Sequence, residues 1–161
     1  RSPAFKEKIL SESLLETIIN FFRKDGWMFT EIREQSALHL KFQGNNGKWG
    51  CYAWVREEHQ QMVFYSICPI VAPESKRLAV AEFITRANSG MAIGNFELNF
   101  ENGEIFYKTS IDVQGDRLSF PLMQRLVYAN VTIMDEYLPG IMAVIQENVT
   151  PVDAIAQLEN N

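Results

Sequence analysis

Two neighbouring segments, residues 48–56 and 62–70, carry apolar side chains on both faces of any strand they form. In the first segment, one apolar set alternates with a second, aromatic set. The first set is Trp49, Cys51, Ala53 and Val55, and the second is Tyr52 and Trp54. Alternation with a period of two is typical of a β-strand, and a strand covered on one side only has a polar second face. These strands are therefore expected either to be central in the sheet and covered on both faces, or to have a second face that meets a partner.

Short polar turns connect the strand-like segments and predict antiparallel pairing. Four segments come first, at residues 27–32, 37–43, 48–56 and 62–70, and two more follow at 96–101 and 105–111. Two of the turns contain the pairs Asn46-Gly47 and Asn102-Gly103. An Asn-Gly pair tolerates the positive φ that a tight hairpin turn needs. The segment 27–32 is short, and it could also simply continue into the strand that follows it.

Helical periodicity separates and follows these strands. The first helix is expected over residues 11–24, where Ser13 and Glu16 have the spacing of a capping box. Pro73 is placed to open a second helix, and residues 119–146 predict a long third one. Pro139 lies inside that third pattern and predicts a kink or a break near residues 135–138, because proline lacks the N–H that a helix interior uses. Thr150 and Pro151 then start a short last helix.

The order of elements is helix, four strands, helix, two strands, long helix and short helix. Helices do not alternate strand by strand, so the pattern favours an α+β fold with an antiparallel sheet over a doubly wound α/β fold. A chain of 161 residues is most simply one domain. We expect a single domain over residues 1–161, with its core at about 11–148 and the short helix at 150–158.

No recognisable catalytic or metal-binding motif occurs in the sequence. Cys51 and Cys68 lack CxxC spacing and are interpreted as buried, reduced thiols, although a disulfide between the two adjacent strands is conceivable. His39 lies on the polar face of its strand and His59 in a turn, far from any nucleophile motif. Two cysteines and two separated histidines are a poor ligand set for structural zinc. We therefore expect no enzyme activity, no metal and no cofactor.

The charge balance argues against two classes of partner. The chain has 15 basic and 20 acidic residues and a net charge of −5, whereas a general nucleic-acid binder needs a basic face. No apolar run reaches the ~18–20 residues that span a bilayer, and no basic-then-apolar secretory pattern is seen. We expect a cytoplasmic protein that binds neither nucleic acid nor membrane.

Aromatic side chains are the informative excess, with 11 Phe, 5 Tyr and 3 Trp. If Trp49 faces the helices, Tyr52 and Trp54 project from the opposite side of the sheet, together with Tyr65 on the next strand. Exposed aromatic patches usually mark association surfaces. A helix over that side is the alternative, and the sequence leaves the two about equal. Tyr52, Trp54 and Tyr65 are the candidate interface residues.

An ordered set of residues resembles the YbjN family of bacterial sensory-transduction regulators, whose fold is similar to that of type III secretion chaperones. The matching features are Gly26-Trp27, Asn46-Gly47 with Trp49, Pro69, Asn88 with Gly94 and Phe96-Glu97-Leu98, and Asp135 with Tyr137 and Pro139. The resemblance covers about residues 11–146. It implies a bacterial cytoplasmic protein with a chaperone-like or regulatory protein-binding role and, by analogy with the secretion chaperones, a homodimer. It supplies no catalytic residues. Secretion chaperones usually show three strands before the second helix, whereas this sequence predicts four.

The leading hypothesis is a non-enzymatic protein-interaction module that forms a homodimer and binds a protein partner. The alternative is a small-molecule or nucleotide sensor with a pocket between the sheet and the long helix. Met123, Met134 and Met142 would line such a pocket, because methionine adapts to irregular ligands. Ordinary core packing explains the same methionines. An enzyme whose site is assembled only in the fold is the third reading.

Overall fold

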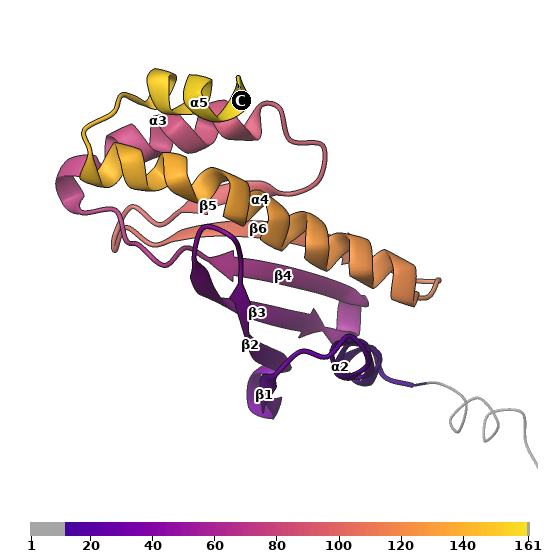
Figure 1. The fold of residues 1–161 in the computed structure, drawn as a ribbon. Helices are drawn as coiled ribbons and strands as arrows, with labels where there is room; N and C mark the ends of the chain where they lie inside the picture. Colours follow the sequence, from indigo (N-terminus) through magenta and orange to yellow (C-terminus); the bar gives the residue numbers. More distant parts are fainter. Residues whose placement is uncertain (1–11, 161) are drawn as a thin grey trace, which may run out of the picture.

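A six-stranded antiparallel sheet forms the centre of the molecule (Figure 1), in a computed structural model that describes residues 12–160. The first four strands are β1 (Phe29–Ile32), β2 (Ala37–Gln43), β3 (Lys48–Arg56) and β4 (Gln61–Ile67). The last two are β5 (Asn95–Leu98) and β6 (Ile105–Asp112). Their order across the sheet is β1-β2-β3-β4-β6-β5. The doubly apolar strands β3 and β4 are therefore central, as their sequence predicts.

Four α-helices accompany the sheet in the described residues. They are α2 (Leu14–Lys24), α3 (Arg77–Asn88), α4 (Phe120–Gln146) and α5 (Pro151–Glu159). Ser13 caps α2 by accepting a hydrogen bond from the Glu16 amide, and Thr150 caps α5 in the same way through Asp153. The predicted α+β class and the predicted order of elements are confirmed.

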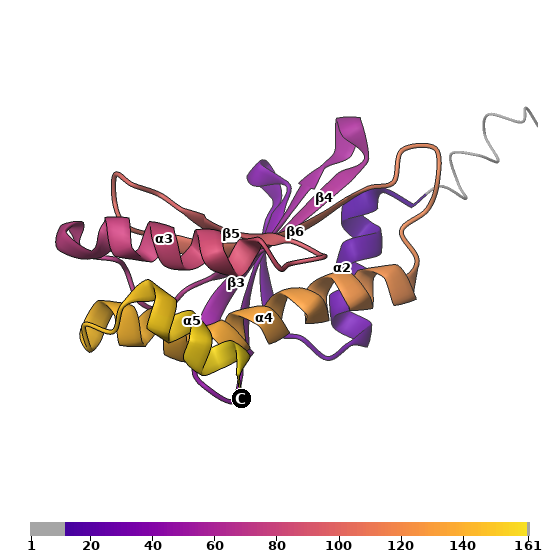
Figure 2. The ribbon, with the colours of Figure 1, turned by 90° about the horizontal axis from the view of Figure 1, so that it is seen from above.

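The helices leave one face of the sheet uncovered. Figure 2 shows α2, α4 and α5 on one side of the sheet and α3 beside its β5 edge. Side chains that point to the helices are fully buried, among them Cys51 and Ala53 of β3 and Phe64 of β4. Between them, the outward residues of β4 are half-buried. The sequence left a helix cover and an uncovered face about equal, and within residues 12–160 the face is uncovered.

Several boundaries differ from the sequence-based expectation. The segment at 27–32 forms a separate strand, because a 3-10 turn at Arg33–Gln35 and a left-handed Ser36 reverse the chain before β2. Strand β4 ends at Ile67 rather than residue 70. Pro73 opens a 3-10 turn at Glu74–Lys76, and α3 begins only at Arg77.

The predicted break in the long helix is absent, because α4 continues through Pro139 as one helix. Proline at that position leaves the Asp135 carbonyl without its usual donor four residues later. The Asn46 side-chain amide replaces that donor and hydrogen-bonds to the Asp135 carbonyl at 2.9 Å. The turn between β2 and β3 thus supplies the hydrogen bond that Pro139 removes.

The same turn is held by the Asp135 side chain rather than by positive φ angles. Its carboxylate accepts hydrogen bonds from the amides of Asn45 and Asn46, at 2.9 and 2.8 Å. Neither Asn46 nor Gly47 has a positive φ, so that part of the prediction is wrong for this turn, whereas Gly103 in the second Asn-Gly turn has a φ of 80°. Two neighbouring backbone amides on one carboxylate fix the turn against α4.

A double-mutant cycle tests this replacement of a helix hydrogen bond. We expect Asn46→Ala to lower the free energy of unfolding by about 1 kcal/mol, because it leaves the Asp135 carbonyl without a hydrogen-bond donor. In a Pro139→Ala background the loss should be smaller, since the amide of the new alanine can bond to that carbonyl. Urea unfolding of the four proteins measures the difference. Equal losses in both backgrounds would contradict the assignment.

Candidate functional site

The uncovered side of the sheet, called the open face below, is apolar and aromatic at its centre. It consists of the outward residues Tyr52, Trp54, Val63, Tyr65, Ile67 and Phe106. Register places Tyr52 directly opposite Tyr65, and Trp54 directly opposite Val63. The three candidate residues predicted from the sequence are thus neighbours on one surface. Phe106, on β6, completes the cluster by packing edge-on against Tyr65 with ring centroids 5.9 Å apart.

Sequence reasoning missed Phe106, Ile67 and Val63 as members of this surface. Ile105 and Tyr107 are buried on the inward side, so Phe106 between them points outward. The sequence does not show which strand lies beside β4. In the structure β4 pairs with β6 rather than with β5. The pairing of β4 with β6 brings Phe106 opposite Ile67 and diagonal to Tyr65.

Trp54 is the most exposed large side chain at the centre of the open face, with 38% of its surface accessible. The Arg56 guanidinium lies 5.5 Å from its ring centroid, which is cation–π distance. Tyr52 donates a hydrogen bond from its hydroxyl to Gln35 Oε1 at 2.8 Å. These contacts orient both rings across the face and leave their apolar surface available.

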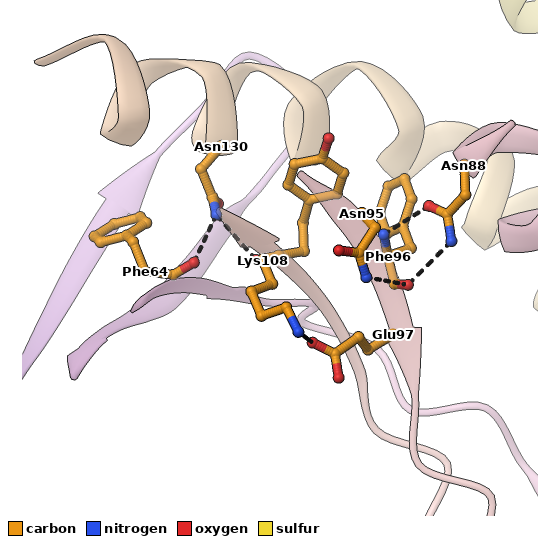
Figure 3. A network of polar contacts seen from close by, with 8 residues as sticks. Phe64, Asn88, Asn95, Phe96, Glu97, Lys108 and Asn130 are labelled. Atoms are coloured by element: carbon orange, nitrogen blue, oxygen red, sulfur yellow. Dashed lines mark hydrogen bonds and ion pairs between the residues drawn. The ribbon is translucent and has the colours of Figure 1, made fainter. Parts of the chain in front are cut away.

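Charged side chains lie at the margins of the open face, with opposite signs on the two sides. Lys41, Lys48 and Arg56 lie on β2 and β3, whereas Glu97 and Asp112 lie on β5 and β6. Lys108 forms a 2.9 Å ion pair with Glu97, which Figure 3 shows beside β5. The centre of the face is therefore mainly apolar. Lys41, Lys48 and Arg56 lie toward one margin, and Asp112 and the Glu97–Lys108 ion pair lie toward the other.

Tyr65 lies next to the Glu97–Lys108 ion pair, and both that pair and partial burial affect its pKa. Burial raises the pKa of Tyr65, the Glu97 carboxylate raises it further, and the Lys108 ammonium partly opposes the shift. A hydrogen bond to Glu97 raises the pKa of Lys108 despite some burial. Both side chains thus keep their ordinary protonation at neutral pH, and the tyrosine presents a neutral ring.

Beneath the open face, the inward side of the sheet is closed by packing and by a few buried hydrogen bonds. Asn130 of α4 donates to the carbonyls of Phe64 and Tyr107 at 2.9 and 3.0 Å, which ties α4 to β4 and β6 (Figure 3). Trp49 donates from its indole N–H to Ser66 Oγ at 3.0 Å. These inward side chains belong to the hydrophobic core, and the open face lies on the other side of the same sheet.

The two cysteines are not placed to react. Both thiols are buried and free, and burial raises the pKa of Cys51 to about 12 and that of Cys68 to about 11. Thiolates are the reactive form of cysteine, so these groups are unreactive near neutral pH. Within residues 12–160 no cluster of three or more His, Cys, Asp or Glu side chains is arranged to hold a metal. The helices of that same part include none that could span a membrane.

A second surface feature is a groove between the sheet and the long helix, called the α4–β6 groove below. It has a volume of about 880 Å³, and its apolar lining is Met91, Ile93, Ile111, Leu122, Leu126 and Ile133. The methionines expected there are elsewhere. Met123 and Met134 are fully buried in the core, and Met142 packs beside it. Core packing is thus the role of Met123 and Met134.

The α+β fold of this chain is similar to that of YbjN and of type III secretion chaperones. The sequence matches the family model described as "Putative bacterial sensory transduction regulator" over residues 14–142. The chain belongs to the YbjN family. Among the curated proteins, none matches this sequence.

Three solved structures share the fold at low sequence identity. The crystal structure of "YbjN, a putative transcription regulator from E. coli" is 14% identical, with a TM-score of 0.58 over 78% of this chain and 89% of that one. The HopA1–SchA chaperone–effector complex is 13% identical, with a TM-score of 0.52 over 78% of this chain and 94% of that one. The Yersinia pestis type III secretion chaperone SycH, in complex with a fragment of YscM2, is 11% identical, with a TM-score of 0.51 over 76% of this chain and 97% of that one. Helix α5 lies beyond the part that matches the family.

Proposed function

We propose that the protein is a non-enzymatic protein-binding module that forms a homodimer through the open face. The observation that carries this proposal is the aromatic cluster of Tyr52, Trp54 and Tyr65 on a sheet face that no helix of residues 12–160 covers. Large apolar patches on soluble proteins mark association sites. The family and its chaperone-like neighbours, two of which were solved with a bound protein, are consistent with such a role.

A second copy of the chain is the occupant that the charges favour. In a twofold dimer each patch meets the same patch of the other copy. A twofold axis that runs along the strands, in the plane between two stacked open faces, would bring the basic margin at Lys41 and Lys48 toward the acidic margin at Glu97 and Asp112 of the other copy. The apolar centre of one copy would contact the apolar centre of the other copy. A face polarised in this way complements its own rotated image.

The remaining parts of the proposal follow from the same surface. A protein of this family with a net charge of −5 is expected to act in the cytoplasm and to leave nucleic acid unbound. The sequence carries no recognisable nucleophile motif, and the proposal therefore includes no catalysis. A regulatory or chaperone-like role would follow from what the module binds.

Sedimentation equilibrium of the full chain tests the dimer. We expect the wild-type protein to have the mass of two chains at micromolar concentration and to dissociate on dilution. Lys41→Glu should weaken association roughly fivefold, as removal of a rim charge pair does. Arg86→Glu makes the same charge change on α3, outside the open face, and serves as the control. A wild-type protein that stays monomeric up to millimolar concentration would overturn the proposal.

A further inference from the structure

The sheet has three stretches of edge backbone, and two of them are guarded. An exposed strand edge invites pairing by another chain unless charge or a cap blocks it. On β1, Glu31 lies opposite Leu38 on the helix side of the sheet, and its carboxylate is held by Arg33 at 2.8 Å and by Arg23 at 3.8 Å, which places charges beside that edge. On β5, the Asn88 side chain accepts from the Phe96 amide at 2.7 Å and donates to the Phe96 carbonyl at 3.1 Å (Figure 3).

The third stretch lies at the end of β6, where β5 has stopped. Strand β5 begins at Asn95, opposite Lys108, and Gly94 with a φ of 80° turns the preceding chain away. The Ile105 carbonyl bonds toward β4, so the odd-numbered residues of β6 face β4 and the even-numbered ones face the β5 side. The N–H and C=O of Ser110 therefore point to an edge that no strand of residues 12–160 occupies.

This unoccupied edge runs along the α4–β6 groove. Ser110 and Ile111 of β6 form one wall of the groove, α4 forms the second, and the loop at Met91–Ile93 forms the third. Ile93 is 60% exposed, so the apolar lining is accessible from solvent. A backbone edge beside apolar pockets is the arrangement by which sheets accept an added strand, with backbone bonds for affinity and pockets for alternate side chains.

The rim of the groove carries one cation without a carboxylate partner. Arg125 lies on the exposed side of α4 next to Leu126, and none of the ion pairs among residues 12–160 includes it. In a chain with an excess of acid, an unpaired guanidinium beside an apolar groove complements a carboxylate on the occupant.

We propose that the α4–β6 groove binds an extended segment of a partner protein as an added strand beside Ser110–Asp112. Apolar side chains at alternate positions would enter the groove, and an Asp or Glu would reach Arg125. A fatty acid would fill the apolar volume and reach Arg125, but it cannot pair with the Ser110 backbone, and this favours a peptide. The proposal rests on the protein-binding function proposed above, but it concerns a different partner on a different surface.

Selection from a displayed library of random octapeptides on the immobilised full chain tests the proposal. We expect the enriched peptides to alternate apolar residues and to carry one Asp or Glu. A synthetic copy should bind Ile93→Asp at least tenfold more weakly than wild type. It should bind Arg125→Glu roughly fivefold more weakly and recover when its acid is changed to Lys. Leu78→Asp, at a 78% exposed site on α3, is the matched control.

Two further probes separate the added strand from other modes of binding. A copy of the peptide methylated on alternate backbone nitrogens keeps its side chains but cannot pair as a strand, and it should not bind. Equal binding of the methylated copy, or binding of laurate by a protein that enriches no peptide, would overturn the proposal.

Two results distinguish the groove proposal from the dimer proposal. Peptides that lose affinity in Trp54→Asp but not in Ile93→Asp would overturn the groove proposal and leave protein binding by the open face intact. A wild-type protein that enriches no peptide and stays monomeric would contradict both proposals.

Discussion

Replacing Gly103 with alanine is expected to lower the free energy of unfolding by at least about 3 kcal/mol. A Cβ at Gly103 would lie 2.0 Å from the Ala72 carbonyl oxygen, and the residue has a φ of 80°. The left-handed conformation alone costs a side-chain-bearing residue roughly 1–2 kcal/mol. The clash adds to this because the Ala72 carbonyl belongs to backbone, and the Gly103 carbonyl accepts from the Ala72 amide at 2.8 Å. The turn between β5 and β6 cannot retreat without breaking that contact.

Gly115→Ala separates the two contributions. Gly115 has a φ of 78°, and nothing lies within 4 Å of a Cβ built on it. Its substitution should therefore lower the free energy of unfolding by only about 1–2 kcal/mol, the conformational part alone. Urea unfolding of both variants gives the comparison. Equal losses for Gly103→Ala and Gly115→Ala would show that the close approach to Ala72 is not maintained in solution.

Trp54→Asp is expected to weaken self-association roughly 100-fold, because truncating a central aromatic anchor commonly removes 2–4 kcal/mol of binding. In a twofold interface the change occurs in both copies, and it places a carboxylate in the apolar centre of the open face. Folding should be nearly unaffected, since the Trp54 side chain is 38% exposed on a surface that the core does not use. Sedimentation velocity over a concentration series measures the dissociation constant.

Leu78→Asp is the matched control for this variant. Leu78 is 78% exposed on α3, outside the open face, so the same introduced charge should leave the dissociation constant unchanged. Circular dichroism and urea unfolding establish that both variants are folded. If Trp54→Asp and Leu78→Asp associate alike, the open face is not the interface.

The strands were predictable because their side chains alternate and their turns are short. Residues 37–43 alternate between Leu38, Leu40, Phe42 and a polar set, and they form β2 with those bounds. The same alternation correctly separated Trp49 from Tyr52 and Trp54. Local periodicity determines which face a residue takes, because successive side chains in a strand point to opposite faces.

Contacts between distant segments were not predictable from periodicity. Pro139 predicted a break in α4, and no local pattern indicates that Asn46, far away in sequence, supplies the missing donor to Asp135. The position of β6 beside β4 is equally non-local, and it decides that Phe106 joins Tyr65. Whether the helices cover one or both faces of the sheet also depends on where they dock, which a single sequence leaves open.

Photo-crosslinking from the centre of the open face tests whether a second copy of the chain binds there. p-Benzoylphenylalanine in place of Tyr52 positions a photoreactive ring on that face, and the same residue in place of Leu78 positions one on α3. After irradiation of the purified protein, the account predicts a covalent pair of chains from position 52 and none from position 78. A chain that remains single from position 52, or that is linked equally well from position 78, would contradict the assignment of the open face as the binding surface.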